Sequence, residues 1–140
     1  MKIVLVGHGH FATGIYSSLQ LIAGNQENVE AIDFVEGMSA DELKQKILLA
    51  ISNEEEVLIL SDLLGGSPFK VSSTIMAKTM NVLSGLNLAM LMEAVFARMA
   101  HSFDEVVNKS VVAARGGVVN GKELFSTDAE EEEEDFESGI

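Results

Sequence analysis

Short, uninterrupted apolar runs that alternate with helix-patterned segments are the feature that most constrains the fold. The run IVLV at residues 3–6 has no polar position, which is typical of a parallel strand buried on both faces. Glycines follow it, and residues 11–23 then place Ile15, Leu19 and Ile22 at helical spacing before Gly24, a residue suited to a helix end. The order of strand, glycine loop and helix predicts an α/β unit.

The same order recurs along the chain. Second, third and fourth strands are predicted from NVEAIDF (28–34), EVLILSD (56–62) and NVLSGLN (81–87). SADE (39–42) is a capping-box sequence that opens a helix with apolar residues at 43, 47, 50 and 51. Ser67 is expected to be the N-cap of a helix that has Pro68 as its first residue and runs to about residue 78.

The last third of the sequence predicts two helices and one more extended segment. The helices are expected over 88–99 and 103–114, and a second capping box, from Ser102 to Glu105, opens the latter. VVNGKELF (118–125) is interpreted as a strand with a turn or bulge at Asn120 and Gly121. The predicted architecture is a doubly wound, mostly parallel central sheet of four strands plus a C-terminal edge strand, with helices on both faces.

The charge of the chain is concentrated at one end. The 140 residues carry a formal charge of −13, but eight acidic residues and no Lys or Arg lie from Asp128 onward, so residues 1–127 carry only −5. We expect one domain over 1–127 and a disordered acidic tail over 128–140. Nine scattered Lys and Arg residues disfavour nucleic-acid binding. The chain has no cysteine, so thiols do not indicate the redox compartment, and the apolar run in MKIVLV is too short for a signal segment; a cytoplasmic location is the expectation.

His8 directly follows the first predicted strand and lies between Gly7 and Gly9. Sites in parallel sheets lie beyond the carboxyl ends of strands, so the imidazole is expected to face a cleft. The helix that begins near Phe11 would direct its N-terminal amides toward the same space and favour a phosphoryl group there. The alternative is a histidine that only makes local hydrogen bonds.

The loop SDLLGGSPF (61–69) is the second candidate. Asp62 ends the third strand, and Gly65, Gly66 and Ser67 precede a helix N-terminus, a combination that can cradle an anion. The same letters also fit an ordinary loop and N-cap. A histidine and an aspartate at adjacent strand ends, however, can form a couple that fixes the ring tautomer and leaves the other ring nitrogen free as a nucleophile.

Other kinds of site lack necessary parts. The sequence contains no GxxxxGK[ST] phosphate loop, and GHGHFATG does not have the spacing of a dinucleotide fingerprint. His8 and His10 supply only two zinc ligands, and His101 is distant in the sequence. We therefore predict neither a metal nor a cofactor.

Four segments together resemble the enzyme IIA component of the mannose-type (mannose, fructose, sorbose) sugar phosphotransferase system. They are VGHG, ENVEAIDF, SDLLGGSPF and GLNLAML, and the similarity runs from residue 3 to about residue 119. The resemblance implies a phosphotransferase, a cytoplasmic phosphocarrier that accepts a phosphoryl group from the phosphohistidine of HPr and passes it to a cognate IIB. It also implies a functional link to the membrane components IIC and IID, and a homodimer in which the last strand joins the partner's sheet.

The resemblance also assigns residues. The family's histidine corresponds to His8, its aspartate partner to Asp62 and its hydroxyl to Ser67, while His10 falls on a variable position. Amides around Gly9, Gly65, Gly66 and Ser67 would then bind the phosphoryl oxygens.

Two other functions remain open on the residues alone. A phosphocarrier subunit of a dihydroxyacetone kinase also has a histidine after its first strand. A non-enzymatic module that binds a phosphorylated ligand at the two glycine loops would retain binding when His8 is replaced by alanine.

Overall fold

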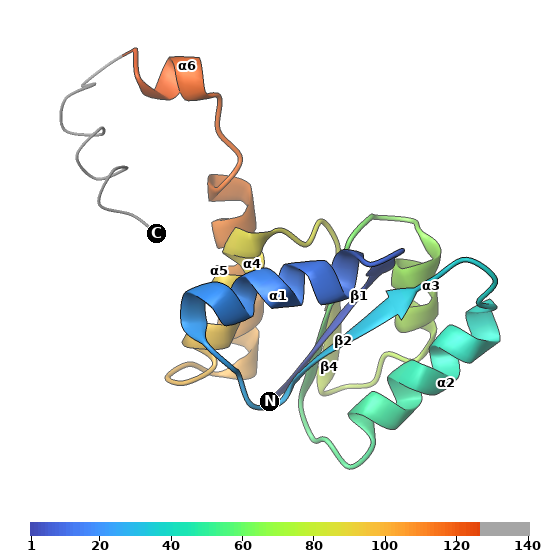
Figure 1. Cartoon of the computed structure of the whole chain (residues 1–140). Coiled ribbons are helices and arrows are strands. Elements are labelled where there is room, and N and C mark those ends of the chain that lie inside the picture. The colour runs from blue at the N-terminus through green and yellow to red at the C-terminus, as the bar shows by residue number, and fades with distance from the viewer. Residues whose placement is uncertain (127–140) are drawn as a thin grey trace.

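The computed structural model describes residues 1–126, so the predicted acidic tail lies outside the described residues. Strands and helices alternate through the first four strands, and helices follow (Figure 1). The elements are β1 (Lys2–His8), α1 (Phe11–Ala23), β2 (Val29–Phe34), α2 (Ala40–Ile51), β3 (Val57–Ser61), α3 (Ser67–Thr74), β4 (Met80–Leu83), α4 (Leu88–Ala97), α5 (Phe103–Gly116) and α6 (Gly121–Leu124).

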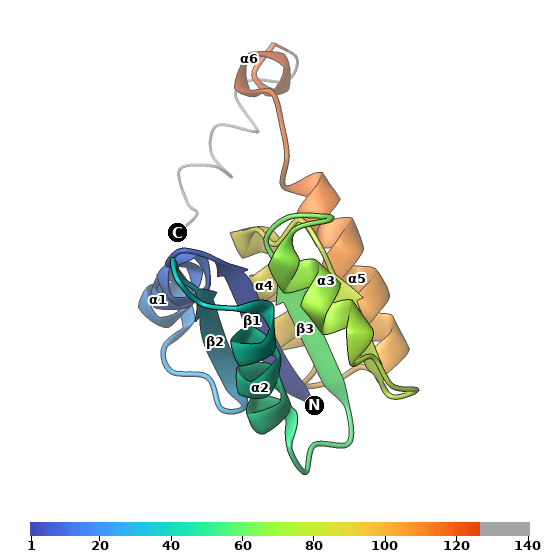
Figure 2. The ribbon, with the colours of Figure 1, turned by 90° about the vertical axis from the view of Figure 1, so that its right-hand side faces the viewer.

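The four strands form one parallel sheet in the order β2-β1-β3-β4. The predicted α/β class is confirmed, with helices covering both faces of the sheet (Figure 2). The strand order reverses direction between β1 and β3, because β2 lies on one side of β1 whereas β3 and β4 lie on the other. This reversal is the place where sites form in such sheets.

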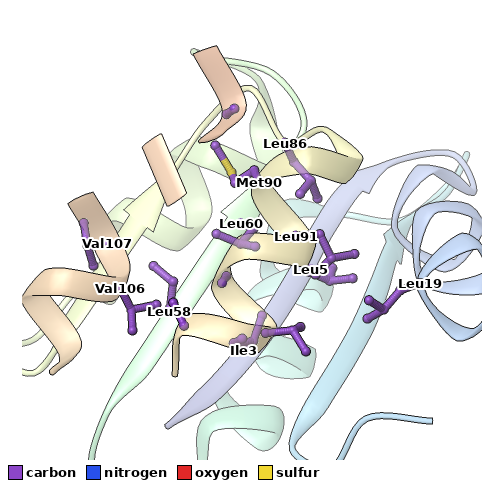
Figure 3. Packing of buried hydrophobic residues seen from close by; sticks show 14 of the residues in the cluster. Ile3, Leu5, Leu19, Leu58, Leu60, Leu86, Met90, Leu91, Val106 and Val107 are labelled. Carbon is purple, nitrogen blue, oxygen red and sulfur yellow. The ribbon is translucent and has the colours of Figure 1, made fainter. Parts of the chain in front are cut away.

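Alternate residues of each central strand pack against opposite helix layers, which explains the apolar runs in the sequence. Ile3 and Leu5 join Leu58 and Leu60 in a core with α1, α4 and α5 (Figure 3). The residues between them, such as Val4 on β1, face the opposite side of the sheet and pack with side chains from α2 and α3. The alternate residues of β3 do the same. The core residues of β1 and β3 are at most 1% exposed, so the two central strands are fixed, and with them the loops at their carboxyl ends.

Most helix ends follow the local sequence. Gly24 has φ +73° and closes α1 by donating its amide to the Gln20 carbonyl. Ser39 caps α2 by accepting from the Glu42 amide, and Ser102 and Glu105 form both hydrogen bonds of a capping box at α5. No helix within residues 1–126 is long and apolar enough to cross a membrane.

The predicted C-terminal edge strand is wrong for this structure. Residues 118–120 have no regular structure, and 121–124 form the short helix α6. Asn120 accepts hydrogen bonds from the Lys122 and Glu123 amides, which favours a helical turn. The segment leads away from the sheet (Figure 1), and a strand cannot form without a neighbour to bond.

Candidate functional site

The His8 and Asp62 side chains meet at the carboxyl ends of the two central strands. His8 is the last residue of β1, and Asp62 directly follows β3. Val6 pairs with Ser61, and the Asp62 amide donates to the Val6 carbonyl at 3.2 Å, so the sheet itself brings the two residues together. They therefore lie where the strand order reverses.

One carboxylate oxygen of Asp62 holds His8 twice. Asp62 Oδ2 accepts from the His8 amide at 2.9 Å and lies 2.7 Å from His8 Nδ1. A carboxylate only accepts hydrogen bonds, so Nδ1 carries a proton, and in the neutral imidazole Nε2 then keeps its lone pair. The imidazole is 47% exposed and its carboxylate partner 11%. The pair can therefore present a ring nitrogen as a nucleophile to a partner in solvent.

Asp62 stays ionised because His8 outweighs the effect of burial. Burial alone would raise the pKa of the Asp62 carboxyl. Hydrogen bonds from the amide and the ring of His8, together with the Leu63 amide, lower the pKa below its ordinary value. A negative Asp62 is what holds the proton on Nδ1 and would stabilise positive charge on the ring.

The backbone at Gly66 lies directly against the His8 ring. A Cβ atom placed on Gly66 would lie 2.7 Å from His8 Cε1 and 3.4 Å from Nε2. A side chain at this position would therefore require the ring or the loop to shift. The preceding Gly65 has φ +80°, a conformation that favours glycine. The two glycines bring the start of α3 to the Nε2 side of the imidazole.

Ser67 lies at the start of α3, one position later than predicted. Gly66 is the N-cap, Ser67 is the first helical residue, and Pro68 follows it in the first turn. As the first helical residue, Ser67 has an amide with no acceptor inside the helix. Within residues 1–126 the Ser67 hydroxyl makes no hydrogen bond, and it is exposed. Both groups therefore remain available to an anion.

Two of the amides expected to bind phosphoryl oxygens are already used inside the fold. The Gly9 amide donates to the Phe34 carbonyl at 2.8 Å, and the Gly66 amide donates to the Leu63 carbonyl at 3.1 Å. Neither amide is therefore free in this structure, and donation from Gly9 or Gly66 to a phosphoryl group stays a prediction. Gly9, with φ +58°, and Gly66 instead shape the turns on either side of the ring.

The N-terminus of α1 is also partly occupied, contrary to the expectation that it would face an anion. The Thr13 amide donates to Asp33 Oδ1 at 3.0 Å, and the Thr13 hydroxyl donates to Asp33 Oδ2 at 2.6 Å. His10 Nδ1 lies 3.0 Å from the same Oδ2. The sequence patterns do not predict Asp33 and Thr13 as part of the site. The available signal was a carboxylate near the carboxyl end of the second strand.

Comparisons with known proteins agree with this geometry. A family model described as PTS system fructose IIA component (EIIA-man) matches residues 2–111. The mannose-specific EIIAB component of Escherichia coli K12 is 38% identical over 124 residues, which cover 84% of this chain and 38% of that protein. The fructose-specific EIIA component of Bacillus subtilis is 29% identical, with 77% of each chain covered.

Solved structures give the same result. An EIIA component from Streptococcus agalactiae has a TM-score of 0.84 and 44% identity, and the match covers 87% of this chain and 98% of that one. A mannose/sorbose-specific IIA subunit from Enterococcus faecalis has a TM-score of 0.78 at 25% identity, with 85% and 92% covered. The chain spans little more than a third of the length of the E. coli relative. The match to the family model extends over most of the chain, which therefore belongs to the EIIA-man family of PTS system fructose IIA components.

Proposed function

We propose that this chain is the IIA phosphocarrier of a sugar phosphotransferase system. It accepts a phosphoryl group from the phosphohistidine of HPr on Nε2 of His8 and passes it to a cognate IIB. The observation that carries the proposal is the His8–Asp62 couple, in which the carboxylate holds Nδ1 at 2.7 Å and Nε2 is left free.

The transfer needs no proton movement on His8. The Nε2 lone pair forms the new N–P bond while the N–P bond of the donor breaks, and the donor nitrogen keeps that electron pair. The phosphorylated ring still carries its Nδ1 proton and becomes positive, which the Asp62 carboxylate stabilises. Because nitrogen replaces nitrogen at phosphorus, the bond broken and the bond formed are alike, and the step is easily reversed toward IIB.

The N-terminus of α3 receives the transferred group. Its first turn faces the Nε2 side of the ring through Gly66, and the Ser67 amide and hydroxyl have no other acceptor among the described residues. Amides and a hydroxyl fixed before the reaction stabilise the charge that spreads over the equatorial phosphoryl oxygens. Gly65 contributes the turn that brings these donors into place.

The proposal extends to partners. HPr is the donor and IIB the acceptor, with the membrane components IIC and IID downstream, and the IIA chain acts as a homodimer in the cytoplasm. Relatives are described as specific for mannose, fructose and sorbose, so the transported substrate belongs to this class of sugars.

The test follows the intact mass of the protein with phosphoenolpyruvate, enzyme I and HPr at neutral pH. We expect one phosphoryl group per chain, lost in acid and mapped to His8. The His8→Ala variant is expected to accept none. His10→Ala serves as the matched control, because it removes the other histidine of the same loop and is expected to reach the same final stoichiometry of one phosphoryl group per chain.

The outcomes separate the alternatives. A label on His10 in the wild-type chain would contradict the choice of histidine but not the carrier function. No label, with HPr shown to be active on another acceptor, would contradict the proposal and favour the dihydroxyacetone-type carrier. Binding of a phosphorylated ligand that survives His8→Ala, with no covalent label, would favour the binding module.

A further inference from the structure

A second histidine–carboxylate pair lies beside the first and has no part in the transfer described above. Asp33, the next-to-last residue of β2, is only 13% exposed, whereas His10 is 84% exposed. The Asp33 carboxylate accepts three hydrogen bonds, from the amide and hydroxyl of Thr13 and from His10 Nδ1. Asp33 is therefore the fixed member of this cluster, because it is nearly buried and accepts all three hydrogen bonds, whereas His10 is exposed.

Asp33 supplies the cap that α1 lacks. His10 is the N-cap residue of α1, yet its side chain makes no capping bond and its backbone has φ −102° and ψ 24°. The carboxylate from β2 instead satisfies the Thr13 amide and places a negative charge at the positive end of the helix. Of the two helix N-termini that flank His8, only that of α3 is therefore left without a carboxylate.

The end of β2 also holds the loop between His8 and His10 at two further points. The Gly9 amide donates to the Phe34 carbonyl at 2.8 Å. The Phe34 ring lies edge-on to the His8 imidazole, with 6.0 Å between centroids. Together with Asp33, these contacts fix both sides of His8, and Asp62 fixes the ring from β3.

We propose that Asp33 is a positioning residue for phosphoryl transfer, which rests on the function proposed above. By holding His10 and the first turn of α1, Asp33 fixes the loop of residues 8–10 so that the His8 ring stays on Asp62. By occupying the N-terminus of α1, it also directs the phosphoryl group to the N-terminus of α3. Asp33 does not touch the reacting atoms.

The test compares Asp33→Ala and Asp33→Asn with Asp41→Asn, an acidic residue in the first turn of α2 that serves as the control. In Asp33→Ala we expect kcat for transfer from phospho-HPr to fall about 10- to 100-fold, the scale of losses from small misplacements of a reacting group. We expect KM to change less than about threefold, because the donor surface is kept. The side-chain oxygen of asparagine can still accept a hydrogen bond from the Thr13 amide, so kcat should fall less in Asp33→Asn than in Asp33→Ala.

A second readout is independent of any donor. Nitrogen NMR of the His8 ring should show the proton on Nδ1 in the wild-type chain and in Asp41→Asn. In Asp33→Ala the ring should shift toward a mixture of the two tautomers, a change that a loss of stability alone does not produce. If the wild-type chain accepts no phosphoryl group, the proposed function fails, but this spectrum still tests the positioning of His8.

Three outcomes would overturn the inference. One is a kcat in Asp33→Ala within twofold of wild type. Another is a rise in KM alone, which would make Asp33 a contact to the donor. The third is a slower transfer with an unchanged His8 ring spectrum, which would reduce the role of Asp33 to general stability.

Discussion

Asp62 and Asp33 both lie at strand ends, are nearly buried, and remain ionised because histidine and backbone donors face them. For each carboxyl, burial would raise the pKa, but the hydrogen bonds it accepts lower the pKa below the ordinary value. A carboxyl whose pKa is lower in the folded state stabilises the fold above its unfolded pKa. That stabilisation is lost as the pH falls through the folded pKa.

Asp62→Asn is therefore expected to change both transfer and acid stability. Transfer should slow by about 10²- to 10⁴-fold, because the amide no longer fixes the ring tautomer or balances its charge. The free energy of unfolding, measured with urea, should be lower than that of wild type at neutral pH, and the difference should shrink below about pH 4. A difference that stays constant down to about pH 2.5 would contradict the assignment of an ionised Asp62.

Gly66→Ala tests the contact between the α3 loop and the imidazole. The new methyl group would lie 2.7 Å from His8 Cε1, so either the ring or the loop must shift. We expect transfer to fall about 10- to 100-fold, since the donors of α3 then move away from the position of the phosphorus. Gly14→Ala, where the structure places nothing within 4 Å of a new Cβ, is the control. Equal rates in the two variants would contradict the close approach.

For single residues, the sequence predicts that His8 and Asp62 lie close together, but it does not predict the hydrogen bonds of the residues around them. Both residues follow apolar strands, and strand ends of a parallel sheet gather at one edge. Hydrogen bonds of the Gly9 and Gly66 amides depend on which carbonyl a turn brings near, and no local pattern states this. The role of Asp33 could not be predicted from a local pattern either, because its partner Thr13 is 20 residues away in the chain.

Among the elements, strands were easier to predict than helix ends. All four strands lie within a few residues of their predicted positions. For β1 and β3 the reason is burial on both faces, which requires a continuous apolar run. Helix α3 ends at Thr74 rather than near residue 78. The hydroxyls of Ser72, Ser73 and Thr74 bond back to carbonyls of the same helix, an arrangement that weakens and bends helices.

Asn87 links two helices, and its loss should lower the stability of the whole fold. Asn87 Oδ1 caps α4 by accepting from the Met90 amide, while its Nδ2 donates to the Ala114 carbonyl of α5. Asn87→Ala is expected to lower the free energy of unfolding by about 1–3 kcal/mol, for one lost cap and one unpaired, partly buried carbonyl.

Asn120→Ala is the matched control for this prediction. Asn120 caps α6 in the same way, but α6 projects from the body of the domain (Figure 2). Urea unfolding should show a loss for Asn87→Ala several times larger than for Asn120→Ala. Similar losses in the two variants would contradict the role of Asn87 as a link between α4 and α5.

For the whole molecule, the homodimer proposed above can be tested at the open edge of β4 and in the C-terminal segment. β4 pairs with β3 alone among the described strands. A groove of about 440 Å³ beside it is lined mostly by apolar side chains, such as Val82, Met90 and Val111, and also by Asn87 and Arg115. Val118 and Val119 are exposed in the segment that leads away from the fold. Two exposed valines without regular structure, close to an open strand edge, are what an exchange between two copies of the chain needs, although residues 121–124 would have to leave the helix α6 to join a strand.

Truncated chains separate the contribution of residues 118–126 to dimer formation from that of the acidic residues that follow. If residues 118–126 supply a strand to the partner's β4, a chain that ends at Ser126 should sediment as a dimer, and a chain that ends at Gly117 should be a monomer. The shorter chain keeps every core residue of the sheet and of α1 to α5, so its far-ultraviolet circular dichroism should stay close to that of the full chain. A dimer that persists in the chain ending at Gly117 would show that the subunits meet elsewhere. A full-length chain that is monomeric at micromolar concentration would contradict the exchange, because paired strands with buried valines resist dissociation.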